Sequence, residues 1–277
     1  MISTALVQLR SGPDMARNVD AASDLIREAR SKGASFVSTP EMTNILEPDR
    51  PRLKSLARLE TEDESVRRFA ALAQELGLWL NIGSLALKGA GDKLVNRSLL
   101  FAPDGSIAAR YDKIHLFDVD LPTGETLRES HAYQGGDRAA LVETPFGVIG
   151  LTICYDMRFP QLYRTLAQAG AKLITVPSAF TVPTGQAHWH VLLRARAIET
   201  GSFVLAAAQG GRHETGRETY GHSLIVSPWG EVLAEAGTDP GIVMAEIDLS
   251  EADLARARIP AVYLDVPFLN PVSAIVT

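Results

Sequence analysis

The chain repeats one order of predicted secondary structure in its two halves. Each half contains a strand, a helix, a strand, a helix, a strand and a hairpin, with short apolar strands and helices of 3.6-residue periodicity. In the first half these elements are predicted at residues 2–9, 15–32, 34–39, 61–76, 78–84 and 94–111. In the second half they are predicted at 148–153, 160–169, 172–176, 187–200, 203–208 and around 228–230. Internal similarity on this scale predicts two equivalent layers, each a sheet with helices on one face.

The two predicted hairpins align residue by residue. The segment SLLFAPDGSIA at 98–108 matches SLIVSPWGEVL at 223–233. Two such sheets would pack face to face, which predicts an α/β fold with a four-layer α-β-β-α sandwich and two pseudo-equivalent halves. Because no Gly/Ser/Pro-rich linker separates the halves, we expect a single domain over 1–277 with its core at about 1–258. The apolar, proline-bearing stretch 259–277 is expected to pack on the body or on a partner subunit.

Helix-end signals support several of these boundaries. The sequence Thr61-Glu-Asp-Glu64 is typical of a capping box and predicts the start of the second helix. Gly33, Gly77 and Gly170 follow apolar helical runs and are predicted to end them.

Composition excludes several functional classes. The net charge of −6 with no basic stripe argues against a nucleic-acid surface. No apolar run approaches the roughly 20 residues needed to cross a bilayer, so no membrane partner is expected. The N-terminus has no basic leader pattern, and one cysteine in 277 residues cannot form an internal disulfide. Both features predict a cytoplasmic location.

That single cysteine, Cys154, lies at the junction of a predicted strand and a predicted helix. The run 146–153 is apolar and β-branched, and Pro160 is well placed at the first position of a helix. A strand, a sharp turn and a helix would leave the Cys154 side chain exposed above the sheet edge, near a helix N-terminus that favours a thiolate. A buried structural cysteine is the alternative, and the local sequence does not decide between the two.

Three charged residues follow predicted strands or hairpins in the same way. Glu41 comes after the second strand, Lys113 after the first hairpin, and Glu129 in the loop beyond it. The carboxyl ends of strands are where functional groups gather in α/β folds. Alone, each has a simpler interpretation: Glu41 as a loop residue, Lys113 as a solvated charge, and Glu129 as a carboxylate at a helix start.

Considered together, the motifs carry a specific resemblance that spans essentially the whole chain. The segments concerned are PE at 40–41, YDKIHLF at 111–117, ICYDMRFP at 153–160, PSAF at 177–180, GQAHW at 185–189, LRARAIE at 193–199, AAAQ at 206–209 and YGHS at 220–223 with PWG at 228–230. The chain resembles the nitrilase (carbon–nitrogen hydrolase) superfamily with its Glu-Lys-Cys signature. It is most similar to the Nit branch, and within that branch closer to deaminated-glutathione amidases than to ω-amidases.

The resemblance implies an amidase mechanism and a set of site residues. Cys154 would attack an amide carbonyl and form a thioester, with Glu41 as the base. Lys113 and the backbone N–H of Tyr155 would hold the oxyanion, and Glu129 would position the base and the lysine. Substrate-binding residues are expected at four positions: Arg158, Ser178, Phe180 and Thr184. No metal and no organic cofactor is expected.

The proton transfer poses a physical problem. Ordinary pKa values of about 4.3 for glutamate and about 8.5 for cysteine make Glu41 a poor base for a thiol. We expect burial to raise the pKa of Glu41 and the nearby Lys113 ammonium to lower that of Cys154. A second carboxylate, Glu129, would raise the proton affinity of the pair.

Other polar residues are interpreted more simply. His188 and His190 are two positions apart on a predicted helix and point to different faces, which makes a poor metal pair. Arg158 has an alternative role in an ion pair with Asp156. Arg196 is expected to be partly buried and paired with Glu199. A phosphatase cradle of the Cys-x₅-Arg type is excluded because residue 160 is proline.

The sequence therefore predicts a thiol-dependent hydrolase that cleaves the amide of a small carboxylate-bearing metabolite and resembles deaminated-glutathione amidases. An ω-amidase of 2-oxo acid amides and an N-carbamoyl amino acid amidohydrolase remain alternatives. A catalytically inactive binding or regulatory subunit is the alternative from a different class. The partners expected are a small-molecule amide and further copies of the chain, as a homodimer or higher homo-oligomer.

Overall fold

Two six-stranded sheets form the centre of the computed structural model, which describes residues 1–121 and 124–269. The first sheet has the order β16-β1-β2-β3-β4-β5. Its strands are β1 (Ile2–Gln8), β2 (Phe36–Ser38), β3 (Trp79–Lys88), β4 (Leu94–Phe101), β5 (Ile107–Asp112) and β16 (Gly241–Ile247). The second sheet has the order β15-β14-β11-β10-β9-β8. Its strands are β8 (Ala140–Thr144), β9 (Gly147–Leu151), β10 (Leu173–Thr175), β11 (Phe203–Ala206), β14 (Leu224–Val226) and β15 (Val232–Glu235).

The two sheets have matching topologies, which confirms the predicted repeat. In each sheet three central strands pair in parallel, β1-β2-β3 and β9-β10-β11. Each continues into an antiparallel hairpin, β4–β5 or β14–β15, and each carries one further antiparallel strand on its other edge, β16 or β8. Sequence periodicity missed β8 and β16. Because β16 comes from the second half of the chain and completes the first sheet, the halves are interlocked.

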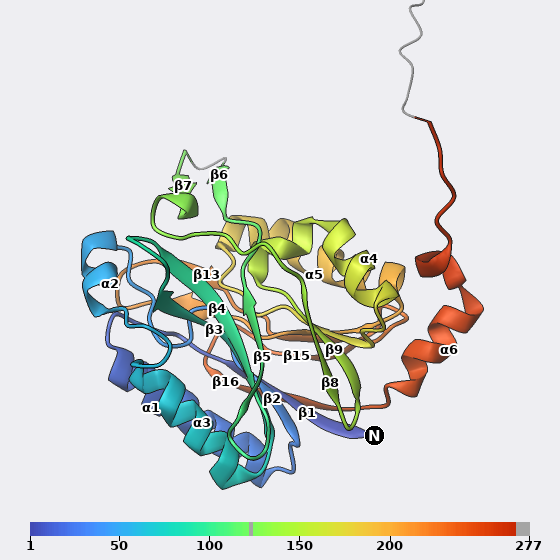
Figure 1. Cartoon of the computed structure of the whole chain (residues 1–277), viewed down its shortest axis with the longest axis horizontal. Coiled ribbons are helices and arrows are strands. Elements are labelled where there is room, and N and C mark those ends of the chain that lie inside the picture. The colour runs from blue at the N-terminus through green and yellow to red at the C-terminus, as the bar shows by residue number, and fades with distance from the viewer. Residues whose placement is uncertain (122–123, 270–277) are drawn as a thin grey trace, which may run out of the picture.

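Helices cover the outer face of each sheet (Figure 1). Helices α1 (Met15–Ser31) and α3 (Glu64–Leu76) lie over the first sheet, and α4 (Pro160–Gln168) and α5 (Val182–Thr200) over the second. One buried cluster joins the inner faces of both sheets and includes Leu6 and Phe36 from the first with Ile149 and Leu173 from the second. Full burial of each such side chain stabilises the fold by about 1.5–3 kcal/mol. The α-β-β-α sandwich predicted from sequence is confirmed.

Two helix starts differ from the predictions. The N-cap of α3 is Asp63, whose carboxylate accepts a hydrogen bond from Val66 N, so the predicted capping box beginning at Thr61 is wrong. Helix α5 begins at Val182, five residues before the predicted start at 187. The prediction missed this start because the first turn of the helix contains a proline and no apolar stripe. The predicted stop at Gly77 is confirmed by its left-handed conformation, with φ of 59°.

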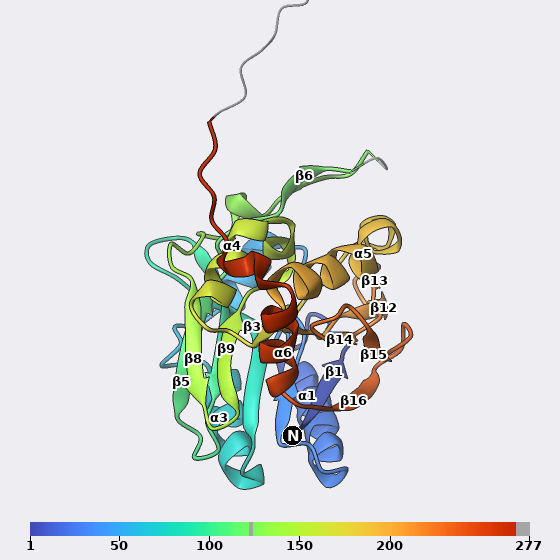
Figure 2. The same cartoon turned by 90° about the vertical axis from the view of Figure 1, so that its right-hand side faces the viewer.

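Several shorter elements surround the sandwich. They are α2 (Arg50–Leu56), β6 (Asp118–Asp120), β7 (Thr126–Arg128), β12 (Gly210–Arg212), β13 (Glu218–Tyr220) and α6 (Ser250–Arg258). The β6–β7 hairpin projects from the body, and α6 runs along the edge of the sandwich (Figure 2). Sequence periodicity missed these elements, since each is too short or too polar to show a pattern. None of the helices within the described residues is long and apolar enough to cross a membrane.

The chain after α6 leaves the body gradually. The 3-10 segment Pro260–Tyr263 buries Val262, and Arg164 of α4 forms an ion pair with Asp265. Val266 and Phe268 are then largely exposed on this single chain. The residues 270–277 of the predicted packing stretch lie outside the described residues, and its contact with a partner subunit stays a prediction.

Candidate active site

Cys154 lies at a sharp turn beyond the end of β9. Its φ of 49° is left-handed, a conformation that costs a non-glycine residue roughly 1–2 kcal/mol. Cys154 N donates to Pro177 O at 2.9 Å, and a 3-10 turn over Cys154–Arg158 leads into α4 at Pro160. The turn directs the side chain into a cavity that Cys154 helps to line. The predicted strand, turn and helix are therefore present. The expected exposure of Cys154 is wrong, because the residue is buried and reaches solvent only through this cavity.

Glu41, Lys113 and Glu129 meet next to this cavity. Lys113 Nζ donates to Glu41 Oε1 and to Glu129 Oε2, each at 2.9 Å. The second oxygen of Glu41 accepts from Ala179 N at 3.0 Å, in the segment just before α5. The Lys113 and Glu41 side chains are only 2% and 6% exposed, so water screens this ion pair little.

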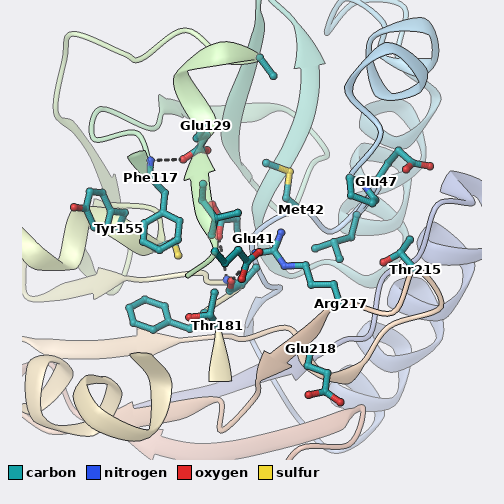
Figure 3. Close-up of a pocket in the computed structure, with 18 of the residues that line it drawn as sticks. Glu41, Met42, Glu47, Phe117, Glu129, Tyr155, Thr181, Thr215, Arg217 and Glu218 are labelled. Carbon is teal, nitrogen blue, oxygen red and sulfur yellow. Dashed lines mark hydrogen bonds between the residues drawn. The ribbon is translucent and has the colours of Figure 1, made fainter. Parts of the chain in front are cut away.

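Asn96 of β4 completes this cluster and was not found from sequence. Its side-chain nitrogen donates to Glu41 Oε1 at 2.9 Å and to Glu129 Oε1 at 3.1 Å. Glu129 Oε2 also accepts from Phe117 N at 2.7 Å (Figure 3). The only sequence signal for Asn96 is a polar residue within a strand that is otherwise mostly apolar. Asn96 and Lys113 thus hold the two carboxylates at fixed positions relative to each other.

The electrostatics of Glu41 favour its ionised form. Burial alone raises the pKa of the Glu41 carboxyl, but the charge and hydrogen bond of Lys113, with smaller effects of Cys154 and Asn96, outweigh it and lower the pKa. Burial lowers the pKa of Lys113, and the charges of Glu129 and Glu41 overcome this and raise it well above its usual value. The pair therefore rests as carboxylate and ammonium.

Cys154 rests as a neutral thiol. Burial raises its pKa most, and the negative charge of Glu41 raises it further, while Lys113 only partly offsets these effects. The net pKa directions are the reverse of those expected from sequence: Glu41 is lowered and Cys154 is raised. Both expected effects are present, but Lys113 outweighs burial at Glu41, and burial with the Glu41 charge outweighs Lys113 at Cys154. A neutral thiol beside an ionised carboxylate is the starting state that a general base requires.

The backbone around the cluster is fixed by buried hydrogen bonds. Gln209 Nε2 donates to the carbonyl of Glu41 at 3.0 Å. Asp156 accepts hydrogen bonds from Tyr111 Oη at 2.7 Å and from Ile153 N at 2.9 Å, and its other oxygen lies 2.7 Å from His115 Nδ1. Asp156 is thereby occupied, so the predicted alternative of an Arg158–Asp156 ion pair is wrong.

The cavity has a volume of about 610 Å³, and its wall combines charged and apolar residues. The β6–β7 hairpin contributes Leu127 and Arg128, and the start of α5 contributes Val182 and Thr184. Arg217, just before β13, points into the same space (Figure 3). Sequence analysis missed Arg217 because its segment carries no strong secondary-structure signal.

The four expected substrate-binding residues fall into two groups. Phe180 and Thr184 line the cavity. Ser178 is fully buried and its hydroxyl donates to Val176 O at 3.0 Å, so it serves the backbone. Arg158 is not in the cavity wall; its guanidinium lies over the rings of Tyr155 and Phe180 and 3.2 Å from His188 Nδ1.

Two further expectations concern Tyr155 and Arg196. Tyr155 directly follows Cys154 in the 3-10 turn and lines the cavity. Arg196 of α5 is buried and forms an ion pair with Glu199, and this confirms its structural interpretation.

Comparison with known proteins gives one consistent result. A carbon–nitrogen hydrolase family model matches residues 3–257. A deaminated glutathione amidase of Bos taurus is 42% identical over 92% of this chain and 79% of its own length. The omega-amidase NIT2 of Homo sapiens is 40% identical, covering 92% of both.

Solved structures agree with these relatives. Nit3 of Saccharomyces cerevisiae, a member of branch 10 of the nitrilase superfamily, superimposes with a TM-score of 0.84 at 32% identity and 94% coverage of both chains. An amidase from Nesterenkonia sp. AN1, with acrylamide added at its active-site cysteine, has a TM-score of 0.78 at 26% identity, covering 95% of this chain and all of that one. The chain belongs to the carbon–nitrogen hydrolase family, in the Nit branch of the nitrilase superfamily.

Proposed function

We propose that this protein hydrolyses a linear amide through a thioester on Cys154, with Glu41 as general base and acid. The observation that carries the proposal is a neutral thiol and an ionised, buried carboxylate facing one cavity, with Lys113 between two glutamates. The amidase names of the relatives and the covalently modified cysteine of the Nesterenkonia amidase support it.

In the first half of the reaction, the thiol proton moves to Glu41 while sulfur bonds to the amide carbon. The carbonyl oxygen then carries the negative charge. Collapse of this intermediate breaks the C–N bond, and the proton on Glu41 goes to the leaving amine. In the second half, water gives a proton to Glu41 and its oxygen attacks the thioester. Collapse releases a carboxylic acid, and the departing sulfur regains the proton from Glu41.

Lys113 and Tyr155 are the proposed oxyanion donors. An ammonium group has three N–H donors, and Glu41 and Glu129 accept two of them. The third is left for the substrate oxygen, together with the backbone N–H of Tyr155. Fixed donors of this kind stabilise the developing charge with little reorganisation, because they are already oriented before the reaction.

Two arginines in the cavity wall offer binding groups for a substrate carboxylate, beside the carboxylates of Glu47, Glu125 and Glu218. Arg50 and Arg217 line the cavity, and neither forms an ion pair within the described residues 1–121 and 124–269. A guanidinium can bind a carboxylate with two parallel hydrogen bonds. We therefore propose a deaminated-glutathione-type amide as substrate, with Arg217 as the carboxylate-binding group and Phe180 and Thr184 contacting the acyl chain.

An ω-amidase activity is the second candidate, supported by the NIT2 relative at nearly the same identity. Measuring kcat/KM for deaminated glutathione and for 2-oxoglutaramate discriminates the two, with release of an amine or of ammonia as the readout. We expect a preference for deaminated glutathione. A preference for 2-oxoglutaramate would assign the ω-amidase activity, and hydrolysis of neither, with no labelling of Cys154, would favour the inactive binding subunit.

We further propose a cytoplasmic single-domain protein that forms a homodimer or higher homo-oligomer. The interlocked sheets support the single domain. The exposed apolar residues Val191 and Ile198 of α5 and Trp229 of the β14–β15 turn support self-association. Sedimentation equilibrium tests the oligomer, and a monomer at micromolar concentration would contradict it.

A further inference from the structure

A second cluster of polar side chains lies outside the cavity, where α5 faces the β14–β15 hairpin. It consists of His190 on α5, His222 just before β14 and Glu235 at the end of β15. His190 Nε2 lies 2.9 Å and His222 Nδ1 lies 2.8 Å from the same oxygen, Glu235 Oε1. The three side chains are between 27% and 37% exposed, so solvent ions reach them.

The chemistry of this cluster is that of a metal ligand set. One ring nitrogen from each histidine and a carboxylate oxygen lie within 4.8 Å of one another. Two imidazoles and one carboxylate form a recurrent protein ligand set for zinc, with a fourth position left for water. We propose that His190, His222 and Glu235 form a binding site for a divalent transition-metal ion of the Zn²⁺ class.

The ligand atoms would have to shift to hold such an ion, with the two histidine nitrogens, which lie within 4.8 Å of each other, reaching the same separation as the other pairs. Ligand atoms about 2.0–2.1 Å from a tetrahedral zinc are ~3.3 Å from one another. The present nitrogen–oxygen separations of 2.8 and 2.9 Å would therefore open by a few tenths of an ångström. Metal binding requires neutral histidines that carry their protons on His190 Nδ1 and His222 Nε2, so that the metal lies between Glu235 and the two facing nitrogens.

The surrounding residues hold the ligands in position. The Tyr220 ring stacks on His222 with centroids 4.4 Å apart, and it lies perpendicular to the His190 ring with centroids 6.3 Å apart. His222 has a left-handed φ of 55°, and its backbone is held by hydrogen bonds from its N–H to Gly237 O and from Trp189 Nε1 to its carbonyl, both 2.8 Å. Ligands whose positions are fixed in advance bind metal more tightly.

The proposed site combines His190 with His222, and not with His188 as in the pair considered from sequence. His188, on the same helix, lies beside Arg158 and does not join the cluster. A metal at the cluster would tie α5 to the β14–β15 hairpin, away from the reacting sulfur. We therefore expect the ion to stabilise the fold without taking part in the amidase step.

The test uses the untagged full-length chain carrying Cys154→Ala, so that the only thiol cannot bind the metal. After treatment with a chelator, the protein is titrated with Zn²⁺ by isothermal calorimetry. We expect one equivalent of Zn²⁺ per chain and an increase in Tm. His190→Ala and Glu235→Gln should each weaken binding at least about tenfold and remove the Tm increase, by analogy with losses seen on perturbing metal shells.

His188→Ala is the matched control, because it removes a neighbouring imidazole from the same helix and should leave both readouts unchanged. His222→Asn tests the third ligand while keeping a residue that tolerates a left-handed backbone. The absence of saturable Zn²⁺ binding, or equal affinity in the parent and in folded Glu235→Gln, would overturn the proposal. Displacement of Zn²⁺ by an excess of Mg²⁺ would also contradict it, because Mg²⁺ selects oxygen ligands.

Discussion

The Lys113 ammonium donates to Glu41 Oε1 at 2.9 Å, and both side chains are almost completely buried. This contact decides which of the two acidic groups in the site holds the proton. It keeps the Glu41 carboxyl ionised with a lowered pKa, and the resulting negative charge, together with burial, raises the pKa of the Cys154 thiol. The resting site therefore holds a neutral thiol and an ionised carboxylate, and does not store a thiolate.

Removing the charge of Glu41 is expected to lower the pKa of Cys154. In Glu41→Gln the burial of the sulfur persists, but the repulsion between a thiolate and the carboxylate is gone while Lys113 remains. Thiolate ultraviolet absorbance measured against pH reports this shift, and Cys154→Ala supplies the blank because the chain has no other thiol. An unchanged or higher thiol pKa in Glu41→Gln would show that Glu41 does not control the sulfur.

Asn96→Ala is expected to move the acidic limb of the pH profile of kcat/KM to higher pH. The proposed mechanism requires ionised Glu41, and the Asn96 hydrogen bond is one of the contacts that lower its pKa. Without that hydrogen bond the carboxyl takes up its proton at a higher pH, and kcat should fall by up to about 100-fold through lost positioning. Asn81→Ala is the control, since its amide contacts Ser38 elsewhere in the sheet. An acidic limb at the same pH in Asn96→Ala as in the parent enzyme would limit Asn96 to a structural role.

Gly83→Ala is expected to impair both stability and catalysis. A Cβ at this position would lie 2.0 Å from Thr39 O and 2.6 Å from Pro40 O, the backbone that leads directly to Glu41. Overpacking of this kind costs about 1–3 kcal/mol, as measured by urea denaturation. Gly91→Ala is a matched control with no neighbouring atom within 4 Å of the added Cβ, although its positive φ adds some strain. Full activity in Gly83→Ala would mean that this close approach does not position the base.

Arg217→Met is expected to raise KM for a carboxylate-bearing amide more than for the corresponding uncharged amide. The reason is the loss of a charge-assisted contact in the cavity wall, worth about 1.5–3 kcal/mol for a hydrogen bond to a charged group. Arg158→Met is the comparison, because Arg158 lies outside that wall. Equal KM changes for both amides would remove Arg217 from substrate recognition.

The repeated order of elements made the sandwich predictable, because the apolar residues of each predicted strand or helix followed the periodicity of that type of element. The edge strands β8 and β16 showed no such periodicity. Strand β16 is only partly buried along most of its length, so its sequence has no apolar alternation. The charged residues of the site were assigned from the motifs that resemble the nitrilase superfamily, because their positions after strands or hairpins left a simpler interpretation open for each. Asn96 and Arg217 were not found, because their roles depend on which distant segments meet across the sheets, and no local pattern encodes that.

The pKa directions at the site could not be predicted for a related reason. Sequence placed a lysine near both Glu41 and Cys154 but could not tell which group it contacts. The structure shows hydrogen bonds from Lys113 to Glu41 and Glu129, and the Lys113 contact lowers the pKa of the Glu41 carboxyl. Burial and the charge of Glu41 raise the pKa of the Cys154 thiol. In the same way, His190 could not be paired with His222 and Glu235 until the hairpin was placed against α5.

The most direct test of covalent catalysis is intact-protein mass spectrometry of the enzyme quenched during turnover of deaminated glutathione, with Cys154→Ala run in parallel. We expect a mass increase equal to the acyl group, located on Cys154, and a loss of turnover of at least about 10⁴-fold in Cys154→Ala with an unchanged Tm. Turnover that persists in folded Cys154→Ala would contradict the account.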